Sequence, residues 1–164
     1  MVIGEKEKVL ALLNEMRIPY QMANHPAVFT IEEMEQLQVV HMDKVAKNLF
    51  VRDEKKRNYY LVMMKNQKRA NLKELQQRIN SSRLSFANED DLRRYLGLSK
   101  GEVSPLGILN DADRIVTVII DNDLMNDEFV GVHPNDNTAT VYISIDDLTK
   151  IFKEYKQRYM FINL

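Results

Sequence analysis

The sequence predicts an α/β protein of the α+β type, in which helices flank a mixed, largely antiparallel central sheet. Apolar runs typical of strands and amphipathic stretches typical of helices are interspersed along the 164 residues, without regular strand–helix–strand alternation. Hydrophobic residues make up 45% and charged residues 29%, as in soluble globular proteins. Because no Pro/Gly/Ser-rich linker interrupts a chain of this length, we expect a single domain over residues 1–164.

Five segments carry helix signals. Residues 5–16 place apolar side chains at helical spacing, and Pro19 ends this helix. Residues 71–80 have a similar apolar face. Gly97 is expected to end another helix in the left-handed conformation. Three pairs have the spacing of capping boxes, which begin helices: Thr30 with Glu33, Asn88 with Asp91, and Ser144 with Asp147.

Strands are predicted where short apolar runs lie between turn signals. Residues 47–64 are expected to form a hairpin around the charged turn 53–58. The continuous apolar run 115–120 predicts a strand that is buried on both faces. Shorter strands are predicted at 20–23, 84–87, 129–130 and 141–143.

Several functional classes are excluded by composition. The chain has no cysteine, so disulfides, thiolate metal sites and a cysteine nucleophile are ruled out. His25, His41 and His133 lack metal-ligand spacing, and we expect neither a metal nor another cofactor. The acidic stretch around Asp121 lacks the glycine of a calcium loop and is interpreted as solvated surface. No 18-residue apolar run or apolar signal core is present, which favours a cytoplasmic protein without a membrane partner.

The net charge of −1 conceals two opposed blocks. Residues 44–83 contain twelve Lys or Arg against three Asp or Glu, whereas residues 84–136 contain four against eleven. The basic block could contact nucleic-acid phosphates. Alternatively, its charges pair with the acidic block in the folded protein. Both interpretations remain open at the level of sequence.

The segment Gly131–Thr140 is the densest collection of polar side chains between two predicted strands. It carries an imidazole, a carboxylate, two amides and a hydroxyl within six positions, where a two- to five-residue turn would suffice. Such density suits a small-molecule or catalytic site. The alternative is an ordinary hairpin turn, since Asn and Asp tolerate left-handed conformations.

Three further segments could contribute to a site. Lys47 begins an apolar strand, where its ammonium could meet a substrate oxygen or phosphate, or could simply extend into solvent. The loop Gly101–Pro105 could present backbone N–H groups to a carbonyl or anion, or could be an ordinary connection. The segment His25–Thr30 joins a histidine, a proline and an aromatic residue just before a capped helix.

Together these four segments, in this order and with similar spacing, resemble the YbaK/ProX family over essentially the whole chain. That family contains trans-editing aminoacyl-tRNA deacylases and the editing domain of bacterial prolyl-tRNA synthetases. The resemblance is greatest to its alanyl-specific branch, PrdX and ProX, and it implies the editing-domain fold. No single segment is specific for the family, but the combination is.

The resemblance also implies roles for individual residues. The family's essential lysine falls on Lys47, which would hold the terminal adenosine phosphate or the ester and offset developing negative charge. The family's GxxxP loop falls on Gly101–Pro105, and its histidine falls on His133, which would limit the size of the aminoacyl pocket. Gly101 is accordingly grouped with Lys47 and His133 as catalytic. Expected substrate-binding residues are Asn48, His25, Phe29, Thr30, Val103, Ser104, Pro105 and Asn135.

The function implied is a trans-editing deacylase that hydrolyses the ester of mischarged Ala-tRNA(Pro). Its partners would be the acceptor end of tRNA(Pro) and, in addition, prolyl-tRNA synthetase, and the protein is expected to be a monomer. Lys55, Lys56, Arg57, Lys65, Lys68 and Arg69 could touch the tRNA. Two alternatives remain: a deacylase for another small aminoacyl group such as Cys-tRNA(Pro), and a non-catalytic tRNA- or synthetase-binding module.

Overall fold

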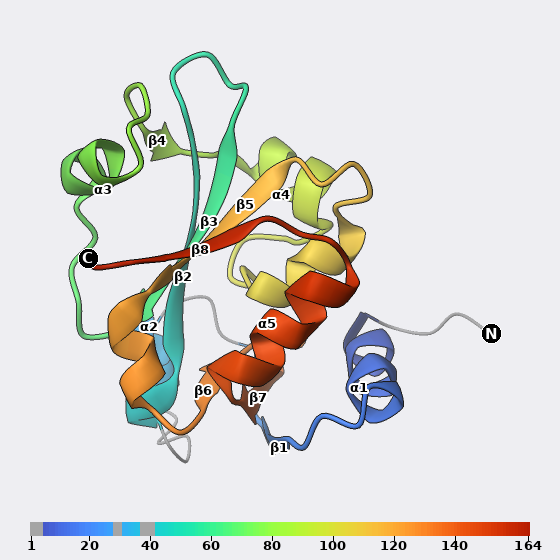
Figure 1. The fold of residues 1–164 in the computed structure, drawn as a ribbon. Helices are drawn as coiled ribbons and strands as arrows, with labels where there is room; N and C mark the ends of the chain where they lie inside the picture. Colours follow the sequence, from blue (N-terminus) through green and yellow to red (C-terminus); the bar gives the residue numbers. More distant parts are fainter. Residues whose placement is uncertain (1–4, 28–30, 37–41) are drawn as a thin grey trace.

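Eight strands in two sheets form the framework of the protein (Figure 1). The computed structural model describes residues 5–27, 31–36 and 42–164. The strands are β1 (Gln21–Asn24), β2 (Ala46–Arg52), β3 (Tyr59–Lys65), β4 (Ser85–Phe86), β5 (Val116–Asp121), β6 (Val130–Val132), β7 (Ala139–Ile143) and β8 (Tyr159–Ile162).

The two sheets differ in strand direction. The smaller sheet has the order β1-β7-β6 and is antiparallel throughout. The larger has the order β4-β2-β3-β5-β8, in which β2 is antiparallel to β3 and β4 while β5 is parallel to β3 and β8. The predicted fold class, a mixed sheet flanked by helices, is therefore confirmed. Strand β8, which pairs with β5 at one edge, was not predicted from the sequence.

Helices cover both faces of the larger sheet (Figure 1). They are α1 (Glu5–Glu15), α2 (Ile31–Gln36), α3 (Leu72–Arg78), α4 (Glu89–Leu96) and α5 (Ile145–Glu154), with 3-10 turns η1 (Met42–Lys44), η2 (Pro105–Asn110) and η3 (Asn122–Asn126). No helix within the described ranges is long and apolar enough to cross a membrane.

Helix ends follow the local signals in the sequence. The Asn88 side chain accepts a hydrogen bond from the backbone N–H of Asp91 at 2.8 Å, and the Asp91 carboxylate accepts one from the Asn88 N–H. Gly97 ends α4 with φ +64°, the left-handed conformation that was predicted. Ser144 caps α5 by accepting from the Asp147 N–H. The third predicted cap, Thr30, lies outside the described residues.

Side chains of the β2–β3 hairpin pack on both faces of the larger sheet. Val51 and Val62 pack with α3 on one face, where Leu75 is also buried. Phe50 and Leu61 face the other way and pack with α4. Further along that second face, a larger apolar core joins the sheets to α1 and α5. Side chains therefore alternate along β2 between the α3 side and the core side.

Candidate functional site

Two loops that are distant in sequence are joined at one point. The Ser104 hydroxyl donates to the backbone carbonyl of His133 at 2.5 Å and accepts from the backbone N–H of Leu106 at 3.2 Å. Ser104 has no exposed surface. The side-chain N–H of Asn135 donates to the Leu106 carbonyl at 3.0 Å. The loops 101–105 and 131–140, both predicted to belong to the site, are thereby held together.

The 131–140 loop contains a tight turn built from its polar residues. Asn135 adopts φ +58°, which Asn tolerates better than most residues. The Asp136 carboxylate accepts from both the N–H and the hydroxyl of Thr138. Asn135 is only 2% exposed, and its Oδ1 has no hydrogen-bond partner among the described residues. The two interpretations of this loop are compatible, because the turn presents His133 beside the neighbouring loop.

Two histidines lie side by side and their hydrogen bonds define their tautomers. His133 Nδ1 is 2.9 Å from the Ala139 carbonyl, which can only accept, so Nδ1 carries the proton. In His25, Nδ1 likewise donates to the Pro26 carbonyl, and Nε2 accepts from the Thr140 hydroxyl at 3.0 Å. The ring centroids are 6.1 Å apart. In the neutral state, His133 therefore keeps an unprotonated Nε2.

Burial controls the charge of the groups at this junction. Burial lowers the pKa of His133, and the neighbouring His25 lowers it further, so the neutral imidazole is favoured. Burial raises the pKa of Glu102, and the nearby Asp136 carboxylate adds to this effect. Glu102 follows Gly101, whose φ of +87° suits glycine. The Asp136 carboxylate thus acts on both groups: it raises the pKa of Glu102 and partly offsets the lowering of the His133 pKa.

Lys47 lies near this junction, at the start of β2. A parallel bridge pairs Val45 with Gly131, so Lys47 and His133 each lie two residues beyond it, in the same direction. Gly131 has to be small here, because a Cβ atom would lie 2.7 Å from the Tyr142 ring. The Lys47 ammonium donates to the backbone carbonyl of Lys68, in the loop between β3 and α3. Lys47 thus lies on the α3 side of the larger sheet.

Lys68 is itself firmly anchored. Its ammonium donates to Asp121 at 2.6 Å and to the Leu164 carbonyl at 2.8 Å, and it forms an ion pair with Asp123. Burial acts to lower the pKa of Lys68, but hydrogen bonds to Asp121 and Asp123 outweigh it and raise the pKa. Asp121 is 1% exposed. The interpretation of the acidic stretch as solvated surface is therefore wrong for Asp121, which is buried as the partner of Lys68.

The remaining predicted residues are placed as follows. Asn48 points to the opposite face of β2 from Lys47; its side-chain N–H donates to the Ala46 carbonyl at 3.5 Å, and its Oδ1 is buried without a partner among the described residues. Pro105 is buried at the first turn of η2, and Val103 packs beside the α4 cluster. Phe29 and Thr30 lie outside the described residues.

Thr140 and Glu102 were not singled out within their segments from the sequence, and Lys68 was considered only as a candidate contact for tRNA. Thr140 is fully buried in a strand, and a hydroxyl in such a position needs a partner, which is a usable signal. The contribution of Lys68 comes from its backbone carbonyl, so its side-chain type gave no indication. Within the described ranges, no group of three or more His, Asp or Glu residues is arranged to hold a metal ion.

Comparison with known proteins places this arrangement in a family. A sequence profile described as "Aminoacyl-tRNA editing domain" matches residues 25–151, which include both loops and Lys47. The chain belongs to the aminoacyl-tRNA editing domain family. Outside the match lie α1 and β1 at one end, and the last turn of α5 with β8 at the other.

Individual relatives agree with membership of the editing-domain family. The chain is 48% identical to the prolyl-tRNA editing protein ProX of Acetoanaerobium sticklandii, over 93% of both chains. It is 34% identical to the prolyl-tRNA synthetase associated domain-containing protein 1 of Danio rerio, over 91% of this chain and 82% of that one. A solved structure described as a candidate trans-editing enzyme for prolyl tRNA synthetase has the same fold, with a TM-score of 0.72, 18% identity, and coverage of 100% and 99%.

Proposed function

We propose that the protein is a trans-editing deacylase that hydrolyses the ester of Ala-tRNA(Pro). The observation that carries the proposal is that Ser104 joins the loops 101–105 and 131–140, while the Val45–Gly131 bridge aligns the second loop with β2, two residues before His133 and Lys47 respectively. The 48% identity to a prolyl-tRNA editing protein supports tRNA(Pro) as the tRNA. The cytoplasm, where tRNA is charged, is the compartment this activity requires.

The chemistry follows from the groups available. Hydrolysis adds water to the ester carbonyl, and negative charge develops on the carbonyl oxygen before the ribose oxygen leaves. The Lys47 ammonium and backbone N–H groups of the Gly101 loop are suited to stabilise that charge. The nucleophile is water, and the neighbouring hydroxyl of the terminal ribose assists it. Catalysis then depends on orientation and electrostatics.

Ser104 has a positioning role in this scheme. Its hydroxyl donates its one hydrogen bond to the His133 carbonyl, and its oxygen also accepts a hydrogen bond from the Leu106 N–H. A serine that acts as a nucleophile instead needs an adjacent general base to take its proton. Ser104 therefore holds the two loops in register. Asn135 acts similarly through Leu106, and its direct contact with substrate stays a prediction.

His133 is suited to limit the size of the aminoacyl group that can bind. Its ring is held by the Ala139 carbonyl, and its burial favours the neutral form. A fixed, uncharged ring limits pocket volume without attracting the substrate's ammonium. Because a pocket can exclude proline by size but cannot exclude a smaller group, such a wall favours alanine over proline.

A deacylation assay with purified protein tests the proposal. Release of alanine from Ala-tRNA(Pro) should be much faster than release of proline from Pro-tRNA(Pro). Cys-tRNA(Pro) in the same assay tests the alternative small substrate. If cysteine is released faster than alanine, the preferred substrate is Cys-tRNA(Pro) and not Ala-tRNA(Pro). Binding of tRNA without hydrolysis of any of these esters would show a non-catalytic binding module.

Lys47→Met tests the mechanism. Loss of one charge-stabilising donor typically costs about 10²–10³-fold in rate, and we expect kcat to fall by that factor. Lys150→Met is the matched control, because Lys150 is an exposed lysine on α5 that pairs with Asp147. An unchanged rate for Lys47→Met would exclude Lys47 from the mechanism while leaving the measured substrate preference intact.

A further inference from the structure

The structure divides the basic block 44–83 into two groups. In the first group the charges are satisfied internally: Lys44 and Lys65 pair with Asp127, and Lys68 pairs with Asp121 and Asp123. In the second group, the exposed side chains of Arg69, Lys73 and Arg83 have no hydrogen-bond or ion-pair partner among the residues that the structure describes. Pairing with the acidic block therefore explains only the first group.

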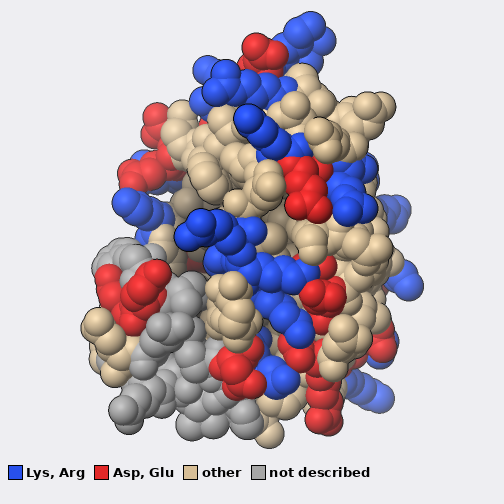
Figure 2. Space-filling model, turned by 90° about the vertical axis from the view of Figure 1, so that its left-hand side faces the viewer, with Lys and Arg blue, Asp and Glu red and all other residues tan. Residues whose placement is uncertain are grey.

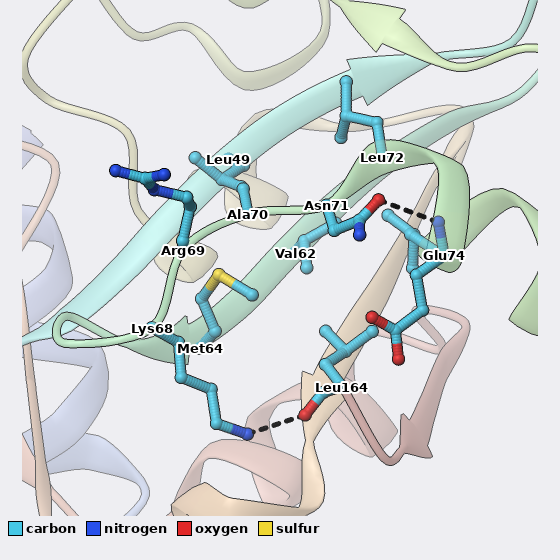
Figure 3. A pocket seen from close by; sticks show the side chains of 11 residues that line it. Leu49, Val62, Met64, Lys68, Arg69, Ala70, Asn71, Leu72, Glu74 and Leu164 are labelled. Atoms are coloured by element: carbon cyan, nitrogen blue, oxygen red, sulfur yellow. Dashed lines mark hydrogen bonds between the residues drawn. The ribbon is translucent and has the colours of Figure 1, made fainter.

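Arg69, Lys73 and Arg83 border a groove along α3. One part is a cavity of about 260 Å³ with apolar walls that include Leu49, Val62 and Met64, and with Lys68, Arg69 and Asn71 among its polar residues (Figure 3). The next hollow is lined by Leu72, Lys73, Gln76, Gln77, Arg83 and Leu84. Because Leu72 borders both, the two hollows lie next to each other along the helix.

An exposed aromatic ring lies on the same side of the sheet. Phe86 is 58% exposed, the largest value among the exposed large apolar side chains of the described residues. It pairs with Val51 in the register of β2 and β4, and Val51 packs on the α3 face. Phe86 therefore projects toward the α3 side. An exposed ring beside unpaired cations is the combination that binds single-stranded nucleic acid, with bases on the ring and phosphates on the cations.

The groove begins next to Lys47. The Lys47 ammonium donates to the carbonyl of Lys68, and Arg69 follows directly in sequence. Met64, opposite Lys47 in the register, and Leu49, two residues further on the same face, both line the cavity. From Lys47 to Val51, beside Phe86, β2 advances four residues, or about 13 Å. Lys and Arg side chains gather across the middle of this face (Figure 2).

We propose that this groove, formed by Arg69, Lys73, Arg83 and Phe86 along α3, binds the single-stranded 3′ end of the tRNA and the adjoining phosphates. The assignment rests on the proposed function, because Lys47 marks where the terminal ester lies. The three cations bind phosphates, and Phe86 stacks on a base a few nucleotides from the ester. The apolar cavity next to Lys47 accommodates the nucleoside between them.

The test compares two triple variants of equal charge change. Arg69→Gln/Lys73→Gln/Arg83→Gln removes the cations of the groove, and Lys8→Gln/Lys150→Gln/Lys153→Gln removes three exposed lysines of α1 and α5. We expect the groove triple to bind uncharged tRNA at least tenfold more weakly in fluorescence anisotropy. Its plot of log affinity against log salt should become shallower by about 2, since each phosphate contact on a single strand contributes about 0.7. The control triple should behave like the wild type.

A short substrate separates RNA binding from chemistry. For the groove triple, the ratio of kcat/KM on Ala-tRNA(Pro) to kcat/KM on alanyl-adenosine should fall at least tenfold. Phe86→Ala should weaken tRNA binding about tenfold, whereas Phe86→Tyr should retain it, because the stacking surface is preserved. Equal effects of the two triples, or an unchanged ratio, would overturn the groove assignment.

The two proposals fail in different ways. If the wild type hydrolyses Ala-tRNA(Pro) and the groove triple has no effect on affinity or on the ratio, the groove assignment is wrong and the deacylase stands. If the wild type binds tRNA through the groove but hydrolyses no ester, the deacylase proposal is wrong and the groove stands. Absence of tRNA binding by the wild type would overturn the groove assignment.

Discussion

The Lys47 ammonium is held by the backbone carbonyl of Lys68, a residue 21 positions later in the chain. Lys68 is fixed in turn by Asp121, which is buried at the end of β5, and by the Leu164 carbonyl. The position of Lys47 therefore depends on a chain of contacts from β2 through the β3–α3 loop to β5 and the residues after β8.

Asp121→Asn should loosen this chain of contacts. Because it leaves the Lys68 ammonium without its buried charged partner, we expect the free energy of unfolding to fall by about 2 kcal/mol. We also expect kcat for deacylation to fall, since the carbonyl that holds Lys47 would become mobile. Urea denaturation and single-turnover assays measure the two effects.

Asp123→Asn is the matched control, because Asp123 also pairs with Lys68 but is 48% exposed. It should change neither stability nor kcat appreciably. Equal effects of the two substitutions would show that burial of Asp121 is not what anchors Lys68.

Ser104→Ala should separate the two loops of the site. The substitution leaves the His133 carbonyl and the Leu106 N–H without their partner in a fully buried position. We expect a loss of about 2 kcal/mol of stability and a fall in kcat that exceeds any change in KM. Ser85→Ala, on the exposed strand β4, serves as the control for serine removal and should alter neither quantity.

The lowered pKa of His133 predicts a specific pH dependence of stability. Between its folded pKa and the ordinary value of 6.5, the unfolded chain binds more protons than the folded one. Stability should therefore fall as the pH drops below 6.5 and level off below the folded pKa. His133→Gln should flatten the curve in this window, as measured by urea denaturation between pH 5 and 7. Identical slopes for variant and wild type would contradict the assignment.

Other groups influence the same titration differently. The pKa of Asp136 is lowered, because hydrogen bonds from Thr138 outweigh its burial, so it affects stability only below its ordinary value of 3.8. The raised pKa of Glu102 has the opposite sign to that of His133, since its contribution declines as the pH rises above 4.5. The difference between wild type and His133→Gln isolates the histidine from both carboxyl groups.

Gly101→Ala should impair activity through the backbone. At φ +87°, a Cβ atom introduces steric strain of about 1–2 kcal/mol, which the loop can relieve by moving away from its present position. We expect lower kcat on Ala-tRNA(Pro) together with modest destabilisation. Gly101→Asn should be affected less, because Asn tolerates positive φ, and the order Gly, Asn, Ala in kcat tests whether conformation is the cause.

The elements that the sequence predicted best are those with local causes. The α4 helix could be located from Asn88, Asp91 and Gly97 because all three act through hydrogen bonds or backbone conformation within nine residues. The β2–β3 hairpin was equally accessible, since the Asp53 carboxylate organises its own turn by accepting from the Arg57 and Asn58 backbone N–H groups. In such segments the determining contacts are between near neighbours.

Contacts between distant segments were not predictable in the same way. Strand β8 is a short apolar run, Tyr159–Ile162, that was not assigned from the sequence; none of its side chains is fully buried, and it is stabilised by parallel pairing with β5. Lys68 and Asp121 are 53 positions apart, and neither residue type indicates the other. The candidate site was predicted from the combination of four segments, whereas the link through Ser104 required the fold. The roles of the site residues in deacylation remain predictions.

The order of the strands has a consequence for biosynthesis. A ribosome delivers Lys47 long before Tyr159–Ile162, yet the parallel partner of β5 and the Leu164 carbonyl that holds Lys68 come from those late residues. Pairings of such large sequence separation form slowly, because the chain loses the entropy of closing a long loop before the new contacts stabilise it. A nascent chain that already contains Lys47 but not yet Leu164 therefore lacks part of the set of contacts that holds Lys68 and, through its carbonyl, Lys47. Deacylase activity should appear only after the C-terminal strand has left the exit tunnel and docked.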